Sequence, residues 1–307
     1  MLIKMRVCVI VPTLNPSLLE LSLLVSRVKA NREHDVRVLC IDSGSRESEI
    51  IKCFADEFIS ISPNEFDHGG TRNKAALLAQ DAEILIFMTQ DAVPIDESMV
   101  ARLIEPLGDD VVAAYARQLP KRDAKHLEAI TRLTNYPPVS QIKNMDSLKL
   151  LGVKNFFFSN VCSAVDRDQF FSLGGFPEHI IMNEDMAFAA NAIRNGKSIQ
   201  YAANAEVYHS HNYSLLQQFR RNFDVGVFFR DYARQVEAGK VGTAGARFVL
   251  DQVSALAKDG RWSIIPEAVL EAGVKFLGFQ FGQRYSLFPV KVRKKMSMHS
   301  FYWQGRK

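Results

Sequence analysis

Short apolar runs alternate with segments of helical periodicity over residues 1–120. The runs are rich in β-branched residues and have the length of buried strands, at Arg6–Val11, Val36–Ile41, Glu57–Ile61, Ile84–Met88 and Val111–Ala116. Between them apolar residues recur every three or four positions, which predicts helices over Pro16–Ala30, Ser45–Ala55, Gly70–Ala79 and Asp96–Pro106. This order is typical of βαβ units and predicts an α/β fold with a doubly wound, mostly parallel sheet.

The pattern is less regular in the rest of the chain. Residues 118–155 contain several prolines and mixed charge, so we predict a helix and a connection there and assign no chemistry to them. A strand-like run at Phe156–Val165 and a helix at Met186–Arg194 extend the α/β part, and the periodicity is helical after that. We therefore expect an α/β domain over residues 1–213 and a helical C-terminal region with a basic end over residues 214–307.

Composition and charge refine this division. The chain has 307 residues and is 47% hydrophobic, which is enough to bury a large core. Its formal charge is only +4, so no nucleic-acid partner is expected. The last 24 residues nevertheless carry +7 and no acid, leaving −3 for residues 1–283. The basic residues of this end are Arg284, Lys291, Arg293, Lys294, Lys295, Arg306 and Lys307.

The cysteines and the N-terminus indicate a cytoplasmic location. The four cysteines (Cys8, Cys40, Cys53 and Cys162) form no CxxC pair and have no metal-ligand spacing. The first apolar run stops at Pro12, which is too short for a signal-peptide core. No apolar stretch approaches the roughly 18 residues of a membrane-spanning helix.

Polar segments follow the predicted strands, where doubly wound sheets bind their ligands. Asp42 ends the second run and precedes Ser43 and Gly44, which places its carboxylate on a tight turn. This carboxylate can accept a hydrogen bond from a ribose hydroxyl or a base N–H, or it can cap the helix predicted from Ser45. The sequence leaves both roles open.

The segment His68–Asn73 precedes a helix and contains Gly69, Gly70 and Arg72. Glycine lets the backbone approach a ligand, and a guanidinium suits phosphate oxygens, so this segment predicts a diphosphate site. A glycine-rich turn with a solvated arginine is the alternative. Neither a GxxxxGK[ST] loop nor a GxGxxG fingerprint follows the first strand, which disfavours ATP hydrolysis and NAD binding.

A metal site is predicted after the strand Ile84–Met88. Asp91 emerges there in the centre of the expected crevice, and a lone carboxylate suits a Mg²⁺ or Mn²⁺ ion that also binds substrate phosphates. A capped loop is the alternative. His209 and His211 can supply a metal ligand or a phosphate contact, although a merely structural histidine pair fits equally well.

Two adjacent acids, Glu184 and Asp185, precede the helix predicted over Met186–Arg194. Acids in a first helical turn commonly complement the helix dipole and do nothing more. A carboxylate within reach of an acceptor hydroxyl can instead act as a general base. Both interpretations fit the sequence.

Taken in order, these residues resemble the inverting nucleotide-sugar glycosyltransferases of the GT-A fold, in the family 2 group that builds bacterial polysaccharides. The resemblance covers about residues 7–213, and Val9–Asn15 resembles the family's first strand and nucleotide-base loop. It implies a GT-A sheet followed here by a helical extension. The nucleotide-sugar contacts that it implies are Pro12, Thr13, Asn15, Asp42, Gly70, Arg72, Asn73 and Gln90.

The resemblance also implies roles for the acids. Asp185 matches the family's catalytic base, and Asn160 and Glu184 match the segment at the acceptor pocket. Asp91 matches the last aspartate of the Asp-x-Asp metal motif, with His209 and His211 as further metal contacts. Thr89 stands where the motif has its first aspartate, so dependence on Mg²⁺ or Mn²⁺ is expected to be weak.

A narrower resemblance is to bacterial rhamnosyltransferases, carried by Phe66–Asn73, Thr89–Ala92 and Tyr208–His211. It implies transfer of L-rhamnose from dTDP-β-L-rhamnose, with inversion, to a saccharide hydroxyl in O-antigen or other cell-surface polysaccharide synthesis. A UDP-sugar donor is the alternative. Gln218–Asn222 resembles the Gln-x-x-Arg-Trp motif of processive synthases, but Asn222 replaces the tryptophan, which argues against a processive enzyme.

The C-terminal end suggests a membrane partner. An apolar helical stretch over Ile264–Phe288 is followed by the basic cluster and then by Phe301, Tyr302 and Trp303. Apolar helix, bases and interfacial aromatics predict contact with an anionic membrane, which would bring the enzyme to a polyprenyl-linked acceptor at the inner face of the cell membrane. The alternative is a helix packed on the core or on a second subunit, which would make a homodimer.

Two other function classes fit parts of the sequence. A sugar nucleotidyltransferase would be expected to have a glycine-rich basic loop after the first strand, where Pro12–Asn15 has neither glycine nor base. A non-catalytic nucleotide-sugar binding module would need Asp42 and Arg72 but not Glu184 and Asp185.

Overall fold

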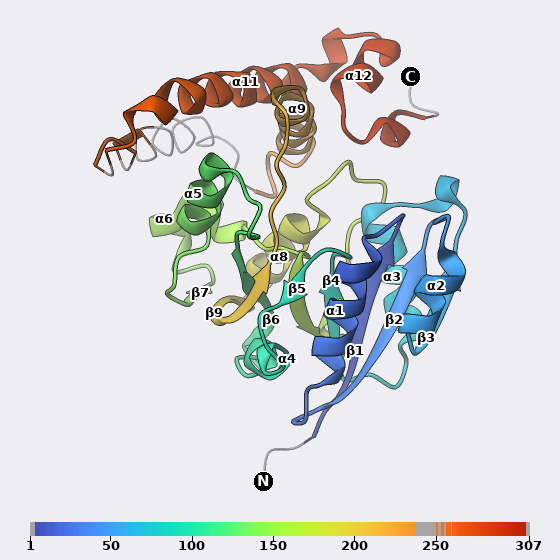
Figure 1. Cartoon of the computed structure of the whole chain (residues 1–307). Helices are drawn as coiled ribbons and strands as arrows, with labels where there is room; N and C mark the ends of the chain where they lie inside the picture. The colour runs from blue at the N-terminus through green and yellow to red at the C-terminus, as the bar shows by residue number, and fades with distance from the viewer. Residues whose placement is uncertain (1–3, 237–249, 251–252, 255, 259, 305–307) are drawn as a thin grey trace.

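The computed structural model describes residues 4–236, 250, 253–254, 256–258 and 260–304, and every structural statement below concerns these residues. They form one sheet in the order β3-β2-β1-β4-β8-β6-β9-β5, with β7 paired to β9 (Figure 1). The strands are β1 (Arg6–Thr13), β2 (Asp35–Asp42), β3 (Glu57–Ser60), β4 (Ile84–Met88), β5 (Val93–Pro94), β6 (Val111–Leu119), β7 (Gln141–Lys143), β8 (Cys162–Asp166) and β9 (Ser198–Tyr208).

Strand directions confirm the predicted mostly parallel sheet. β1 pairs in parallel with both β2 and β4, and β2 pairs in parallel with β3. β8 is antiparallel to β4 and to β6, so β6 and its parallel partner β9 run in the same direction as β1. The carboxyl ends of β1, β2, β4, β6 and β9 therefore meet at one edge of the sheet, where ligands of such folds bind.

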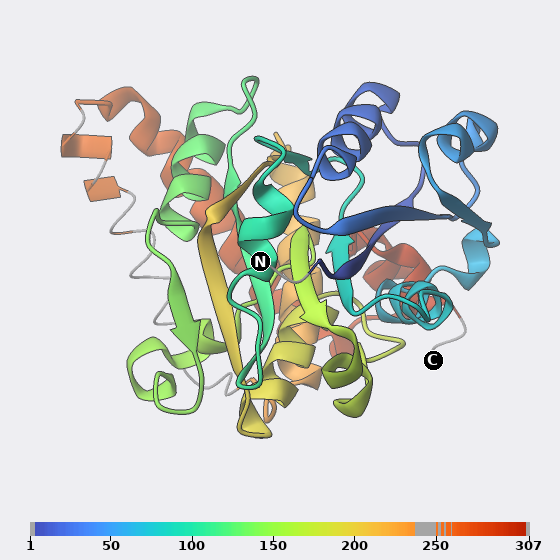
Figure 2. The same ribbon diagram turned by 90° about the horizontal axis from the view of Figure 1, so that it is seen from below.

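Helices cover both faces of the sheet because its strands are apolar on both sides. Val7 and Val9 face one core, whereas Cys8 and Ile10 face the other, and all four are buried. Figure 2 shows α1 and α2 on one side of the sheet and α3 on the other. The helices of the α/β part are α1 (Leu18–Lys29), α2 (Ser48–Phe54), α3 (His68–Leu78), α4 (Met99–Ile104), α5 (His126–Asn135), α6 (Leu148–Leu151), α7 (Arg167–Ser172) and α8 (Glu184–Arg194).

Several predicted elements differ from the structure in their bounds, among them α4, which is shorter than the predicted Asp96–Pro106, and β6, which extends past Ala116 to Leu119. The strand predicted over Phe156–Val165 is wrong in its first half: a 3-10 helix covers Gly152–Phe156 and β8 begins only at Cys162. The intervening Phe158 and Ser159 are buried without strand partners, so their apolar character marks the core and not a strand. α2 begins three residues later than predicted, because Asp42 holds residues 42–45 in a turn.

The C-terminal region consists of a helix pair and a returning segment. α9 (Leu215–Asp231) begins with a capping box between Ser214 and Gln217, and its Phe223, Val227 and Phe228 are fully buried in the main core. α11 (Ile265–Gln283) lies across α9, and α12 (Val290–Met296) follows it (Figure 1). The predicted boundary at residues 213 and 214 thus coincides with the start of a helix that shares the core of the α/β part.

Glycines set the distance between α9 and α11. A Cβ atom on Gly278 would lie 2.3 Å from the carbonyl oxygen of Phe219, and one on Gly282 would lie 1.9 Å from that of Phe223. Only glycine allows this backbone approach, so the helices pack through their glycine faces. Phe279 and Phe281 of α11 contact phenylalanine rings of α9. By contrast, Val269, Leu270, Phe276 and Leu277 of α11 are each at least half exposed. No helix among the described residues is long and apolar enough to span a membrane.

The aromatic residues at the C-terminal end do not form an exposed interfacial belt. Residues Ser300–Trp303 form a 3-10 helix that returns to the protein, and Trp303 is only 1% exposed, beside Phe223 and Tyr285. For Trp303 the expectation of an interfacial position is therefore wrong, because its ring is buried in the core. Phe301 and Tyr302 are partly exposed.

Candidate active site

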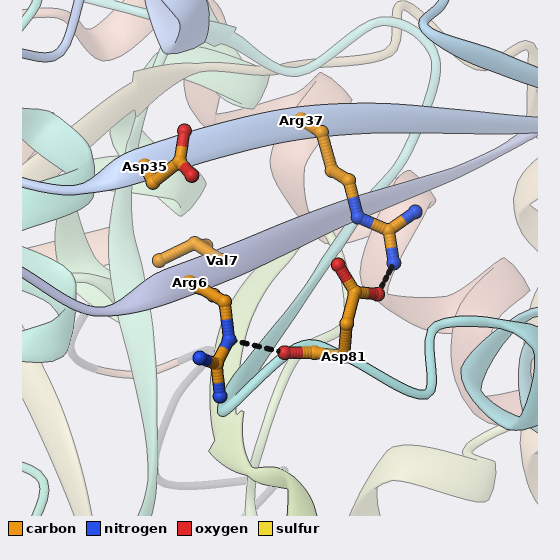
Figure 3. A pocket seen from close by; sticks show the side chains of 5 residues that line it. All are labelled: Arg6, Val7, Asp35, Arg37 and Asp81. Atoms are coloured by element: carbon orange, nitrogen blue, oxygen red, sulfur yellow. Dashed lines mark hydrogen bonds and ion pairs between the residues drawn. The ribbon is translucent and has the colours of Figure 1, made fainter.

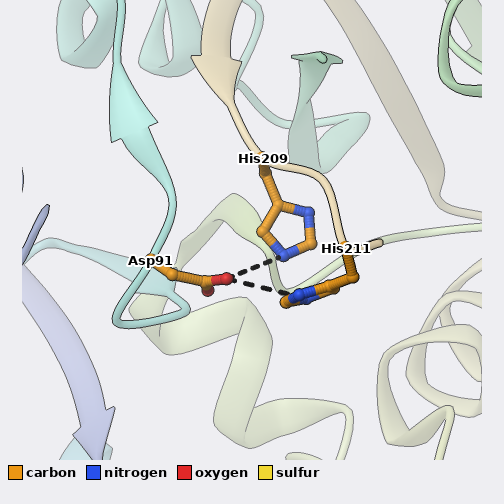
Figure 4. Close-up of side chains that lie close together, drawn as sticks. All are labelled: Asp91, His209 and His211. Carbon is orange, nitrogen blue, oxygen red and sulfur yellow. Dashed lines mark ion pairs between the residues drawn. The ribbon is translucent and has the colours of Figure 1, made fainter. Parts of the chain in front are cut away.

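Three acceptor groups converge at the carboxyl edge of the sheet. Asp91 stands in the turn after β4, and His209 and His211 follow β9 (Figure 4). The Asp91 Oδ2 atom lies 3.5 Å from Nε2 of His209 and 3.6 Å from Nε2 of His211. One ligand atom from each of the three residues lies within 4.8 Å of the other two. The structure thus brings together the three predicted metal contacts from positions more than a hundred residues apart.

Burial favours the neutral form of both imidazoles of this cluster. Burial lowers the pKa of His209 well below its usual value and also lowers that of His211, with Asp91 acting in the opposite direction on His211. Two neutral imidazole nitrogens therefore face a carboxylate oxygen. The nearest ammonium, that of Lys121, lies 3.8 Å from Asp91 but only 2.5 Å from Glu20. The cluster lacks a positive charge at its centre, and its imidazole and carboxylate donors suit a divalent cation.

A second cluster surrounds Asp185 at the start of α8. Asn183 adopts the left-handed conformation with φ of 61°, which turns the chain into the helix. The two Asp185 oxygens accept hydrogen bonds from the backbone N–H of Asn160 at 2.9 Å and of Met186 at 2.7 Å. Desolvation and the neighbouring Glu184 nevertheless raise the pKa of Asp185 to about 7, against the lowering effects of these bonds and of Arg72. Such a pKa suits a general base at neutral pH.

Arg72 and Glu184 form a buried ion pair. Their closest atoms, Nη1 and Oε1, lie 3.2 Å apart, and each side chain is only 7% exposed. Arg72 also donates to the His68 carbonyl at 2.8 Å, and the amide of Asn160 donates to Glu184 at 3.1 Å. The guanidinium predicted to contact the diphosphate is thus already partnered, and the carboxylate beside the base is held by two donors.

The predicted nucleotide loop is held by its own polar side chains. Asp42 is fully buried and accepts from the Thr13 hydroxyl at 2.8 Å and from the Ser45 backbone at 2.8 Å. It therefore fixes a turn, and the N-cap residue of α2 is Glu47. Gln90 ties the loop to the end of β4 by accepting from Leu14 N–H at 2.8 Å and donating to Leu14 carbonyl at 3.2 Å.

The remaining residues predicted to contact the nucleotide sugar differ in how many of their polar groups are already hydrogen-bonded within the protein. Pro12 is partly buried and Asn15 is exposed, with φ of 45° and its side chain bonded to the Arg46 N–H. The Gly70 N–H donates to Asp67 at 2.7 Å. The amide of Asn73 makes reciprocal bonds with the backbone of Phe176, at 2.8 and 3.0 Å, so it joins α3 to the loop before α8.

The structure adds residues that the sequence did not single out. The returning C-terminal segment places His299 against His68, with their rings 4.6 Å apart and burial lowering the pKa of each to about 3. Asp224 of α9 anchors this segment by accepting from the N–H groups of Met298 and His299 at 2.8 and 3.1 Å. His299 and Asp224 lie far along the chain from the segment His68–Asn73, so no local sequence pattern connects them with it.

Arg221 is a second addition. Its guanidinium lies over the Tyr213 ring at 5.9 Å, and this ring stacks on His211. Its charge helps to lower the pKa of His209 and of His299, so it acts on both histidine pairs. Arg221 is exposed and forms no ion pair with a described residue. The Gln-x-x-Arg pattern at Gln218–Arg221 is the sequence signal for it, although the tryptophan that completes the motif of processive synthases is absent.

The opposite edge of the sheet carries no such chemistry. A small pocket there is lined by Arg6, Val7, Asp35, Arg37 and Asp81 (Figure 3). Its two arginines are ion-paired, Arg37 with Asp81 and Glu57 and Arg6 with Glu83. The pocket lies at the amino ends of β1 and β2, away from the predicted site residues.

Comparison with known proteins identifies relatives over nearly the whole chain. Residues 8–171 match the model of glycosyl transferase family 2. The chain is 38% identical over 300 residues to the O-antigen chain rhamnosyltransferase WbaN of Salmonella anatum, covering 96% of this chain and 95% of that protein. It is 36% identical over 307 residues to the O-antigen chain rhamnosyltransferase RfbN of Salmonella typhimurium, covering 98% and 97%.

Solved structures of lower identity share the fold. A mannosyltransferase from Pyrobaculum calidifontis, solved with GDP-Man and Mn²⁺, aligns with a TM-score of 0.57 at 16% identity, covering 98% of this chain and 85% of that one. TarS residues 1–349 from S. aureus, solved with UDP-GlcNAc, align with a TM-score of 0.52 at 12% identity, covering 92% of both chains. The chain therefore has the GT-A fold of these glycosyltransferases.

Proposed function

Because this chain belongs to glycosyl transferase family 2 and is a glycosyltransferase, we propose that it transfers L-rhamnose from dTDP-β-L-rhamnose to a saccharide hydroxyl during O-antigen synthesis. The sugar and the pathway rest on the two rhamnosyltransferases that match it from end to end. The reaction rests on one geometric observation: a carboxylate with a pKa near 7 shares an edge of the sheet with a cluster of acceptors suited to a cation.

Asp185 acts as the general base. The acceptor hydroxyl oxygen forms a bond to the anomeric carbon, its proton passes to an Asp185 oxygen, and the bond from that carbon to the diphosphate oxygen breaks. The leaving dTDP takes the bonding electrons. A single displacement from the opposite face converts the β-donor into an α-L-rhamnoside.

The departing diphosphate needs positive charge. Asp91, His209 and His211 would hold Mg²⁺ or Mn²⁺, which when bound supplies electrostatic stabilisation of the leaving group. Arg221, whose guanidinium has no anionic partner among the described residues, meets the remaining charge. Arg72 keeps its ion pair with Glu184 and so shapes the base instead of binding phosphate directly.

Nucleotide release from candidate donors tests the proposal. The protein is incubated with dTDP-rhamnose, UDP-glucose or GDP-mannose, with and without an O-antigen saccharide, and nucleoside diphosphate is measured. We expect release of dTDP that increases with acceptor and an α-linked product by NMR. Release of UDP but not dTDP would show that the donor is a UDP-sugar. Release of pyrophosphate from a nucleoside triphosphate and a sugar phosphate would indicate a nucleotidyltransferase. Binding of a donor without release of nucleotide would indicate a non-catalytic binding module.

The acceptor is lipid-linked, and α11 brings the enzyme to the inner face of the membrane. The basis for this part of the proposal is the exposed apolar face of α11 (Val269, Leu270, Phe276 and Leu277) next to the exposed bases Lys291, Lys294 and Lys295 of α12. An apolar face beside clustered bases complements an anionic bilayer, at about 1 kcal/mol for each base near the surface.

Vesicle flotation tests membrane binding. Phe276→Ser with Leu277→Ser should reduce flotation with phosphatidylglycerol vesicles at least tenfold, whereas Leu150→Ser, which changes a side chain that is 85% exposed on α6, should not. Unchanged flotation of the double variant would contradict the role of α11. A change from dimer to monomer in solution without loss of flotation would assign the same face to a homodimer.

A further inference from the structure

Gln118 lies between the two clusters and is almost completely buried. It stands near the end of β6 with 1% of its surface exposed. Its Nε2 atom lies 2.6 Å from the Tyr136 hydroxyl and 3.0 Å from the Ser159 hydroxyl. Its Oε1 atom lies 2.5 Å from Nη1 of Arg132 and 3.0 Å from Nδ1 of His209. All the hydrogen-bonding capacity of this amide is therefore directed at four neighbours.

Arg132 fixes which way the amide points. A guanidinium can only donate, so the Gln118 atom that faces it must be the oxygen. The hydroxyls of Tyr136 and Ser159 can each donate or accept and would tolerate either orientation. Arg132 is itself held by Glu128, four residues earlier on α5. The oxygen that faces Arg132 is also the one that faces His209.

This orientation determines the tautomer of His209. Its Nδ1 must carry the proton, because it faces an oxygen that can only accept. The lone pair is then on Nε2, which points at Asp91 and towards the centre of the acceptor cluster. An imidazole without such a partner distributes its proton between both nitrogens and can turn about its own axis.

We propose that Gln118, oriented by Arg132, is the positioning residue that keeps the lone pair of His209 Nε2 directed into the Asp91–His209–His211 cluster. This inference rests on the proposed cation site and adds to it the group that prepares one of its ligands. Partners of this kind typically change the affinity of a metal site by about 10- to 100-fold when they are lost.

The same amide links the cation cluster to the base. Ser159, which Gln118 contacts, directly precedes Asn160, whose N–H donates to Asp185. A shift of Gln118 would therefore displace groups in both clusters, His209 in one and the Asn160 N–H beside Asp185 in the other. We expect its loss to lower kcat more than it raises the KM for the donor, because it disturbs the cation ligand and the base together.

Mn²⁺ binding in the presence of dTDP tests the proposal without turnover. Electron paramagnetic resonance should show that Gln118→Met weakens Mn²⁺ binding about 10- to 100-fold. Gln118→Glu should retain it, because a carboxylate still accepts from His209 and Arg132, while the two hydroxyls can donate to it. Ser159→Ala is the matched control, since it removes a Gln118 contact without touching His209.

A spectroscopic readout needs neither metal nor activity. In ¹⁵N-histidine-labelled protein free of metal, the His209 resonances should report the Nδ1–H tautomer. They should report a mixture in Gln118→Met and also in Arg132→Met, which frees the amide to turn over. If Gln118→Met does not fold, Arg132→Met carries the same test.

The outcomes separate this inference from the proposed cation site. Wild-type Mn²⁺ affinity and an unchanged tautomer in a folded Gln118→Met or Arg132→Met variant would overturn the role of Gln118. Absence of Mn²⁺ binding by the wild-type protein would overturn the cation site instead, and the tautomer would then decide whether Gln118 still orders His209.

Discussion

Two polar clusters at the same edge of the sheet differ in how their charges are balanced. Around Arg72, the guanidinium meets the Glu184 carboxylate at 3.2 Å and both side chains are buried. Around Asp91, a carboxylate and two neutral imidazoles face one another with no cation among the described residues between them. Buried polar groups are normally satisfied, so the first cluster is scaffold and the second is prepared for a ligand.

Asp185 belongs to the first cluster but, unlike Glu184, has no ionic partner there among the described residues. It shares the helix start with Glu184 but is held only by two N–H groups, and its raised pKa supports the proposal that it is the reactive member of the first cluster. Removing one charged group should therefore reduce the stability of the fold in the Arg72 cluster but reduce ligand binding in the Asp91 cluster.

Replacing the base should have the largest effect. Asp185→Asn keeps the shape of the side chain and removes its ability to take a proton, so kcat should fall about 10²- to 10⁴-fold. Binding of dTDP, measured by calorimetry, should stay within about twofold. Asp168→Asn, which changes a side chain that is 95% exposed on α7, is the control. A loss of dTDP affinity as large as the loss of rate would contradict this role.

Breaking the scaffold cluster should unfold the protein more easily. Arg72→Met leaves the buried Glu184 carboxylate without its cation, which should reduce the free energy of unfolding by about 3–5 kcal/mol. Urea titration measures this. Arg167→Met, whose side chain is 20% exposed and paired with an exposed acid, should change stability by less than about 1 kcal/mol. Equal stability of the two variants would show that Arg72 is free to bind ligand.

The same kind of change in the acceptor cluster should leave the fold intact. Asp91→Asn removes a charge whose nearest cation, Lys121, lies 3.8 Å away and pairs more closely with Glu20, so metal-free stability should change by less than about 1 kcal/mol. Mn²⁺ affinity should fall by more than the roughly 10- to 100-fold expected for a supporting group. A strongly destabilised variant with unchanged Mn²⁺ binding would reverse the assignment of the two clusters.

The pH dependence is the mildest test. Glu184 and desolvation raise the pKa of Asp185 to about 7, Arg72 and two N–H groups oppose them, and the base must be ionised to act. The rate constant kcat/KM should therefore fall about tenfold for each pH unit below 7. The folded protein holds this proton more tightly than the unfolded chain does. The contribution of Asp185 to the free energy of unfolding should therefore be largest below about pH 4 and should decline as the pH rises to about 7. A rate that is flat from pH 5 to 8 would exclude Asp185 as the base.

Much of the first half of the fold could be predicted from the sequence. The strand Ile84–Met88 is observed with the predicted bounds, because a fully buried strand is a continuous apolar run between polar turns. Asp42, Asp91 and Asp185 could be identified for a similar local reason, since each directly follows or opens such an element. Local pattern did not reveal that Asp42 is fully buried in a turn or that Asn73 is bonded to Phe176.

Residues 118–155 illustrate the opposite case. The sequence suggested no chemistry there, yet Gln118 and Arg132 lie in this segment and orient His209, which is 91 residues from Gln118. The C-terminal end was misread for the same reason. Composition predicts that Trp303 is amphipathic, but it cannot tell whether the nearest apolar surface is a membrane or the core.

Periodicity and local motifs were enough to predict most strands and helices of residues 1–120, the family and the candidate acids of the site, because these features are local in the chain. Which charges have an ionic partner and which do not depends on the tertiary structure. That outcome depends on distances between groups brought together by the sheet, such as Arg72 with Glu184 and Asp91 with the histidines. Electrostatic energy depends on those distances and on burial, neither of which is written in any single stretch of sequence.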